Sequence, residues 1–104
     1  PITRGIHTTI TATPRPGGDA ARGEEAWESA YAGARFVRLL QGAALPEVRN
    51  VAGTNFIDMA CCHDLRTNRM LLFSAEDNLV KGAAGQAVQC LNVIYEWGEE
   101  CGLI

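Results

Sequence analysis

The residues best suited to chemistry lie in one stretch, 77–89, which reads DNLVKGAAGQAVQ. Asp77 or Asn78 is a typical start of a helix, and the backbone N–H groups of residues 78–80 then lie at the positive end of the helix dipole. A phosphate or a carboxamide would bind well there, and Lys81 adds a positive charge beside it. From the residues alone, two plainer interpretations stay open. Asn78 can simply satisfy backbone groups, and Lys81 can be a solvated surface lysine.

Two glycines make this stretch unusual for a surface helix. Gly82 and Gly85 fall in its first two turns, and each costs roughly 1 kcal/mol relative to alanine in a helix interior. That cost is tolerated where something must come close to the backbone. The sequence predicts that either a ligand or a tightly packed strand approaches here.

The other reactive residue types form no recognisable site. The four cysteines, Cys61, Cys62, Cys90 and Cys101, include no C-x-x-C pair, and His63 beside Cys62 does not have the spacing of a zinc finger. We therefore expect reduced thiols in a cytoplasmic protein and no metal site. No G-x-G-x-x-G occurs either, so no dinucleotide-binding loop is expected in this chain.

Composition predicts one domain and excludes several function classes. The chain has 104 residues, 47% of them hydrophobic, and a net charge of −3. Its Lys and Arg residues are scattered rather than gathered in a stripe, so we expect no nucleic-acid partner. No apolar run reaches the ~20 residues of a membrane span, and no signal peptide is visible. The absence of an initiator Met favours a segment of a longer protein.

Hydrophobic periodicity predicts six elements in the order β-α-β-β-β-α. Strands are expected at 2–13, 36–40, 54–63 and 70–75, and helices at 19–33 and from 77 or 78 to about 97. The third and fourth strands should form an antiparallel hairpin across the polar connection 64–69. The predicted fold class is α+β, with a mainly antiparallel sheet and helices on one face.

The last helix carries an apolar stripe at helical spacing. Its members lie at gaps of four, three, four and three residues, which predicts one buried face: Val80, Ala84, Ala87, Leu91 and Ile94. Gly98 stands where a glycine commonly ends a helix.

Several motifs resemble those of the N-acetyl-γ-glutamyl-phosphate reductases. DNLVKGAAGQAVQ followed by LNVIY is similar to the closing motif of that family. The family's other signatures appear in the same order along nearly the whole chain: PITRGI at 1–6, YAGARFVRL at 31–39, VAGTNFIDMACCHDLRTNRMLLFSAEDN at 51–78 and the terminal GEECGLI. Glu76, where an apolar residue is usual, and Cys61-Cys62-His63 depart from the pattern.

The resemblance implies a function and a set of site residues. It implies the C-terminal part of a catalytic domain like that of glyceraldehyde-phosphate dehydrogenase, which supplies sheet and subunit contacts in a homo-oligomer. It places Asn78 against the nicotinamide carboxamide of NADP, with Lys81 and Gly82 near the ribose-phosphate portion. Arg4 is implied as a residue that orients N-acetyl-γ-glutamyl phosphate at the rim of the active site, and a salt bridge at the edge of the sheet stays open as its plainer role.

The resemblance also implies what lies elsewhere. The family's nucleophilic cysteine, its histidine base and its nucleotide-binding domain all precede the matched region, so residues 1–104 are expected to contain no catalytic residue and to be inactive alone. Three alternatives remain open. They are a related lysine-pathway aminoadipyl-phosphate reductase or aspartate-semialdehyde dehydrogenase, a non-catalytic dimerisation module, and a small nucleotide-binding module built on the last helix.

Overall fold

The structure is a computed structural model that describes residues 3–104, and it contains a four-stranded sheet. The strands are β1 (Ile6–Ala12), β2 (Val37–Leu39), β3 (Ile57–Asp64) and β4 (Arg69–Glu76). Their spatial order is β1-β4-β3-β2, and both β1 and β3 run antiparallel to β4. The α+β fold class with a mainly antiparallel sheet is therefore confirmed, while the part of the predicted first strand at residues 1 and 2 lies outside the described residues.

The β3–β4 hairpin forms where the sequence predicts it. Asp64 pairs with Arg69 at its closed end. The Asp64 carboxylate accepts hydrogen bonds from the backbone N–H of Arg66 (3.0 Å) and from the Thr67 hydroxyl (2.5 Å), as short polar side chains do in turns. Asn68 takes the left-handed conformation with φ 51°. Side-chain hydrogen bonds in the turn thus fix the register of the hairpin.

The segment between the second and third strands differs from the prediction. β2 lies parallel to β3, a pairing that the sequence does not predict, because the chain makes a long crossover before β3 begins. That crossover contains a short helix, α2 (Val48–Val51), which is not among the predicted elements and which contacts β4. β3 begins at Ile57, so residues 54–56, predicted as strand, form a bend that leads into it instead.

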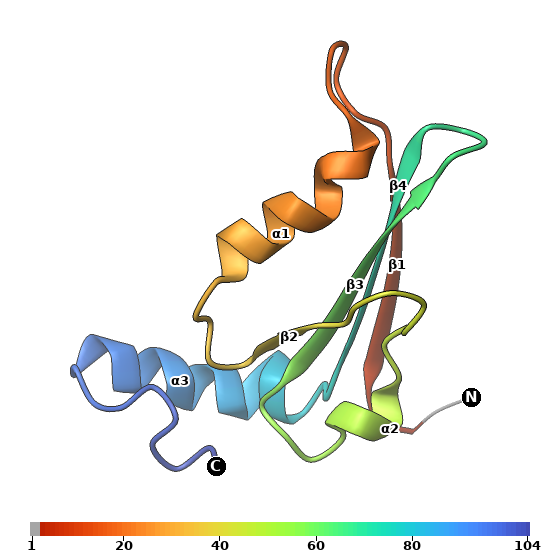
Figure 1. Cartoon of the computed structure of the whole chain (residues 1–104). Helices are drawn as coiled ribbons and strands as arrows, with labels where there is room; N and C mark the ends of the chain where they lie inside the picture. The colour runs from red at the N-terminus through yellow and green to blue at the C-terminus, as the bar shows by residue number, and fades with distance from the viewer. Residues whose placement is uncertain (1–2) are drawn as a thin grey trace.

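The first helical region covers part of one face of the sheet (Figure 1). It begins with η1 (Ala20–Arg22), continues as α1 (Gly23–Tyr31), and contacts β2 and β3. Asp19 caps it as predicted, since its carboxylate accepts from the Ala21 N–H at 2.9 Å. A Cβ atom at Gly23 would lie 2.7 Å from the sulfur of Met70 and 2.9 Å from that of Cys61. The helix therefore comes very close to the sheet at its first residue, where only a glycine fits.

The last helix differs from the prediction in type, length and burial. It begins with a π-helical turn, η2 (Val80–Ala84), continues as α3 (Gly85–Ile94), and ends before Trp97, with Glu96 at φ 56°. Gly98 is therefore not its terminating residue. The apolar stripe is also not buried, because Leu91 is 45% and Ile94 74% exposed. α3 projects from the end of the sheet, and nothing within residues 3–104 covers that side of it (Figure 1).

The core is small and is formed by η1, the crossover and the sheet. Its fully buried apolar residues are Ala20, Phe36, Val51, Ala60 and Ala75. Phe36 packs against Phe56 with ring centroids 5.4 Å apart. Arg38 on β2 binds the buried Asp58 on β3 at 2.6 Å, which ties the two parallel strands together. Within the described residues, no helix is long and apolar enough to cross a membrane.

Candidate functional site

Two residues before β1, Arg4 and Gly5, meet two residues before η2, Asp77 and Asn78, at one end of the sheet. Arg4 Nε lies 2.7 Å from Asp77 Oδ2, and the Asp77 side chain is fully buried while that of Arg4 is 44% exposed. The same carboxylate oxygen accepts from the backbone N–H of Gly53 at 2.5 Å. Its other oxygen accepts from the N–H groups of Leu79 (2.8 Å) and Val80 (3.0 Å). One carboxylate thus joins three segments that are distant in sequence.

These contacts keep Asp77 ionised. Burial alone raises the pKa of a carboxyl group, because it penalises the charged form. Here the three backbone N–H groups and the Arg4 guanidinium stabilise the carboxylate more strongly, and the pKa of Asp77 falls to about 2. The Asp77 carboxylate therefore stays charged at neutral pH, where it binds both the helix start and the Arg4 guanidinium.

Asn78 is fixed by the residue that follows Arg4. The backbone N–H of Gly5 donates to Asn78 Oδ1 at 2.7 Å. Because that oxygen is occupied, the NH₂ group of the Asn78 amide is the half that can meet a ligand, and it is a donor. Gly5 must be glycine for two reasons. Its φ is +117°, and a Cβ atom would lie 2.1 Å from Val48 Cγ1.

Lys81 does not join Arg4 and Asn78. Its ammonium donates to Gln89 Oε1 at 2.7 Å and lies 5.7 Å from the centroid of the Phe36 ring, within the range of a cation–π contact. Burial lowers the pKa of Lys81, and the carboxylates of Glu76 and Glu99 oppose that shift. Lys81 is therefore a half-buried lysine with defined partners, rather than a freely solvated one.

The two glycines of the helix have different surroundings. A Cβ atom at Gly85 would lie 2.3 Å from Asn55 Oδ1 and 2.8 Å from the Val80 carbonyl oxygen. At Gly82 the nearest atom, Glu76 Oε1, would be 3.4 Å away, which is ordinary contact. Packing against Asn55 therefore accounts for Gly85, whereas the protein's own atoms do not require a glycine at position 82.

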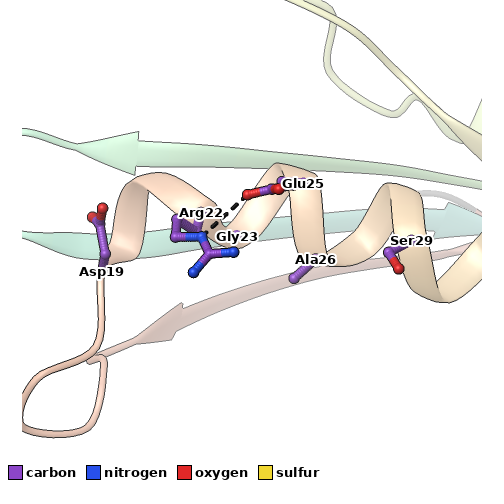
Figure 2. A pocket seen from close by; sticks show the side chains of 6 residues that line it. All are labelled: Asp19, Arg22, Gly23, Glu25, Ala26 and Ser29. Atoms are coloured by element: carbon purple, nitrogen blue, oxygen red, sulfur yellow. Dashed lines mark hydrogen bonds and ion pairs between the residues drawn. The ribbon is translucent and has the colours of Figure 1, made fainter.

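Hollows lie beside α1 in the described part of the chain. An open one of about 470 Å³ is lined by Asp19, Arg22, Gly23, Glu25, Ala26 and Ser29. It contains one ion pair between exposed side chains, Arg22 with Glu25 at 3.1 Å (Figure 2). A second, apolar one of about 350 Å³ lies between α1 and the sheet, with Trp27, Tyr31 and Lys81 in its lining. Within residues 3–104, no three His, Cys, Asp or Glu side chains form a group that could hold a metal ion.

Sequence reasoning names Arg4 and Asn78 as candidate site residues but does not predict the residues that hold their side chains. Asp77 was recognised only as a helix start, although it is the buried centre of the site. Gly5, Gly53 and Asn55 were not predicted to contact the last helix. In the sequence, these residues are recognisable only as glycines and an asparagine near the ends of strands. The residues that they contact in the last helix and before it lie more than twenty positions away, so no local pattern predicts the contacts.

The family follows from a match to known sequences. The family model described as "Semialdehyde dehydrogenase, dimerisation domain" matches residues 1–78. The chain belongs to this family. Its sheet, from β1 to β4, falls inside the matched region, as do Arg4 and Asn78.

Relatives of this chain confirm the resemblance that its motifs predict. It is 47% identical over 103 residues to the N-acetyl-γ-glutamyl-phosphate reductase of Akkermansia muciniphila and covers 30% of that protein. It is 45% identical to the enzyme of the same name from Pelobacter propionicus, again covering 30% of it. Both alignments cover 99% of this chain. The chain thus spans about a third of the length of these relatives.

A solved structure shares the fold of this chain. Aspartate semialdehyde dehydrogenase II from Vibrio cholerae superposes with a TM-score of 0.68 at 23% sequence identity. The likeness covers 89% of this chain and 28% of that one. At this identity the comparison establishes the fold of the semialdehyde dehydrogenase domain and nothing about substrate.

Proposed function

We propose that this chain is the C-terminal portion of the catalytic domain of an NADP-dependent N-acetyl-γ-glutamyl-phosphate reductase. The observation that carries the proposal is the meeting of Arg4 and Asn78 around Asp77, since these are the two positions that the family motifs mark as substrate and cofactor contacts. The 47% identity to a reductase of that name favours this substrate over the aspartyl and aminoadipyl phosphates of related enzymes.

The geometry of Asn78 fits a nicotinamide carboxamide. With Oδ1 held by Gly5, the Asn78 NH₂ group would donate to the carboxamide oxygen, and the start of η2 would lie beside the ring. Gly82, whose missing Cβ is not required by internal packing, would leave room for the ribose-phosphate portion. When bound, NADPH supplies the hydride, and the residues of this chain only place it.

Arg4 fits an anionic substrate. Its Nε is held by Asp77, and the side chain is 44% exposed, so the terminal guanidinium nitrogens remain available as donors. A guanidinium whose orientation is fixed by a buried carboxylate recognises phosphate and carboxylate oxygens well. The thiol nucleophile, the general base and the nucleotide loop would lie elsewhere in the polypeptide, which we place in the cytoplasm as part of arginine biosynthesis.

The experiment that tests the proposal uses the complete polypeptide that contains this chain. NADPH oxidation should be driven by N-acetyl-γ-glutamyl phosphate, with a kcat/KM well above that for β-aspartyl phosphate. Arg4→Met should raise KM for the acyl phosphate, while Arg15→Met, on an exposed loop, should leave it unchanged. Preference for β-aspartyl phosphate, or no oxidation with either compound, would contradict the proposed substrate.

A second function is favoured by the family description, which names a dimerisation domain. We propose that the sheet also contributes subunit contacts in a homo-oligomer. Sedimentation of the complete polypeptide should therefore give a dimer or a larger assembly. A monomer at micromolar concentration would contradict this role without affecting the proposed reaction.

A further inference from the structure

Four polar side chains from distant segments meet beside η2. Gln89 Oε1 on α3 accepts from Lys81 Nζ at 2.7 Å and from Asn55 Nδ2 at 2.9 Å. Gln89 Nε2 donates to Glu99 Oε1 in the C-terminal segment at 2.6 Å. Gln89 thus links the start of the last helix, the turn before β3 and the end of the chain.

The chemistry of the partners fixes the direction of every bond in this group. The Lys81 ammonium is only a donor and the Glu99 carboxylate is only an acceptor, so the Gln89 amide has one possible orientation. Asn55 must then present its NH₂ to Gln89. Its Oδ1 has no hydrogen-bond partner among residues 3–104, although Asn55 is 1% exposed. An unsatisfied buried oxygen is rare in native proteins, and here it follows from holding Lys81.

Gly85 is part of the same arrangement. The unpartnered Asn55 Oδ1 occupies the place that a Cβ atom at position 85 would need, since the two would be 2.3 Å apart. The helix therefore accepts a glycine in its interior so that Asn55 can reach Gln89. Gly85, one of the two unusual glycines of the last helix, therefore belongs to the hydrogen-bond network around Lys81.

The C-terminal segment is held in place by the neighbouring turn of α3. Asn92, which is 2% exposed, donates from Nδ2 to the carbonyl oxygens of Glu99 (3.0 Å) and Cys101 (2.9 Å). These bonds fold the segment back along α3, as Figure 1 shows, and set the position from which the Glu99 carboxylate reaches Gln89.

We propose that Gln89 and Glu99 are positioning residues for Lys81, so that the C-terminal segment forms part of the cofactor site. The inference rests on the proposed function, together with the implication of the family resemblance that Lys81 lies near the ribose-phosphate portion of NADP. One of the three ammonium donors is held by Gln89, which leaves two for phosphate oxygens. Glu99 acts through Gln89, because its carboxylate polarises the amide whose oxygen binds Lys81.

The test compares substitutions in the complete polypeptide. Glu99→Ala should raise KM for NADPH about 2- to 10-fold, the effect of one lost hydrogen bond, with kcat unchanged. Glu99→Gln keeps an acceptor for Gln89 and should restore most of the affinity. Glu100→Ala, a change at the adjacent exposed carboxylate, should leave KM at the wild-type value.

A double-mutant cycle separates positioning from general stability. In a Lys81→Met background, Glu99→Ala should produce no further rise in KM for NADPH, because the residue through which it acts is gone. An equal rise in both backgrounds, or an unchanged KM in Glu99→Ala, overturns the inference while the proposed function stands. A wild-type polypeptide that does not oxidise NADPH with the acyl phosphate overturns the proposed function itself.

Discussion

At the residue scale, the site depends on a single buried carboxylate. Asp77 accepts from Arg4 and from three backbone N–H groups, and its side chain is fully buried. A residue in this position decides two things at once: where η2 begins and how the Arg4 guanidinium is oriented. The local sequence indicates the first role, through a helix-capping aspartate. The second depends on residues more than seventy positions away, so no local pattern predicts it.

Asp77 should make stability depend on acid pH. Its pKa is about 2 in the folded chain and about 3.9 in an unfolded one, so its contribution is complete above about pH 4 and is lost as the pH falls toward 2. We expect Asp77→Asn to lower the free energy of unfolding at about pH 6, and the difference from wild type to shrink between about pH 4 and 2. Urea unfolding followed by circular dichroism measures this. Asp19→Asn, an exposed cap, is the control, and a pH-independent difference would contradict the assignment.

The two glycines of the last helix should respond oppositely to alanine. Gly85→Ala forces a Cβ against Asn55 Oδ1 and should destabilise the chain by about 1–3 kcal/mol. Gly82→Ala has room for its methyl group and should be neutral or stabilise by up to about 1 kcal/mol. Thermal unfolding of both variants tests the pair.

Gly82→Ala also tests the proposed cofactor contact. If Gly82 borders NADP, this variant should show a raised KM for NADPH in the complete polypeptide despite its unchanged or improved stability. An unchanged KM would remove Gly82 from the cofactor site, and a loss of stability comparable to that of Gly85→Ala would contradict the packing argument.

At the element scale, strands followed sequence patterns more closely than the last helix did. The β3–β4 hairpin and the alternation of Cys61 and Cys62 between faces follow from period-two patterning, which is local. α2 and the parallel pairing of β2 with β3 depend on the path of a crossover and were not predicted. The stripe on α3 was recognised correctly as apolar, but periodicity does not reveal whether the surface that covers it belongs to the same segment.

The exposed side of α3 should tolerate polar residues in this chain. Ile94 is 74% exposed, so Ile94→Lys should change the unfolding free energy of the 104-residue chain by less than about 0.5 kcal/mol. In the complete polypeptide, where we propose that α3 packs against the nucleotide-binding domain, the same change should lower the melting temperature by several degrees. Val51→Lys, at a fully buried position, should unfold both. Equal effects of Ile94→Lys in the two forms would contradict the proposed packing.

At the scale of the whole molecule, the proposed function makes the chain a scaffold with two ligand contacts rather than a complete reaction centre. The large apolar residues of α3 and of the segment after it are exposed, and the core contains few large side chains. Relatives are about three times longer. The family motifs in the sequence already indicate that the chain is part of a longer enzyme. The contacts of Arg4 with Asp77 and of Lys81 with Gln89 are seen only in the structure.

The isolated 104-residue chain should show no turnover. Under the proposed function it lacks the nucleophile, the base and the nucleotide loop, so NADPH oxidation with N-acetyl-γ-glutamyl phosphate should not exceed the rate without protein. Mixing it with the preceding part of the polypeptide, expressed separately, should restore activity if the two associate. Turnover by the isolated chain would contradict the assignment of the catalytic residues to another part of the protein.

The most direct test of the central claim is KM for NADPH in Asn78→Ala, measured in the complete polypeptide. Asn78 is held by Gly5 so that its amide NH₂ faces the proposed carboxamide, and its loss should raise KM about 10-fold, the value of a well-oriented hydrogen bond. Asn50→Ala, an exposed asparagine in α2, should leave KM unchanged. An Asn78→Ala enzyme that folds and retains the wild-type KM would show that the start of the last helix does not contact the cofactor.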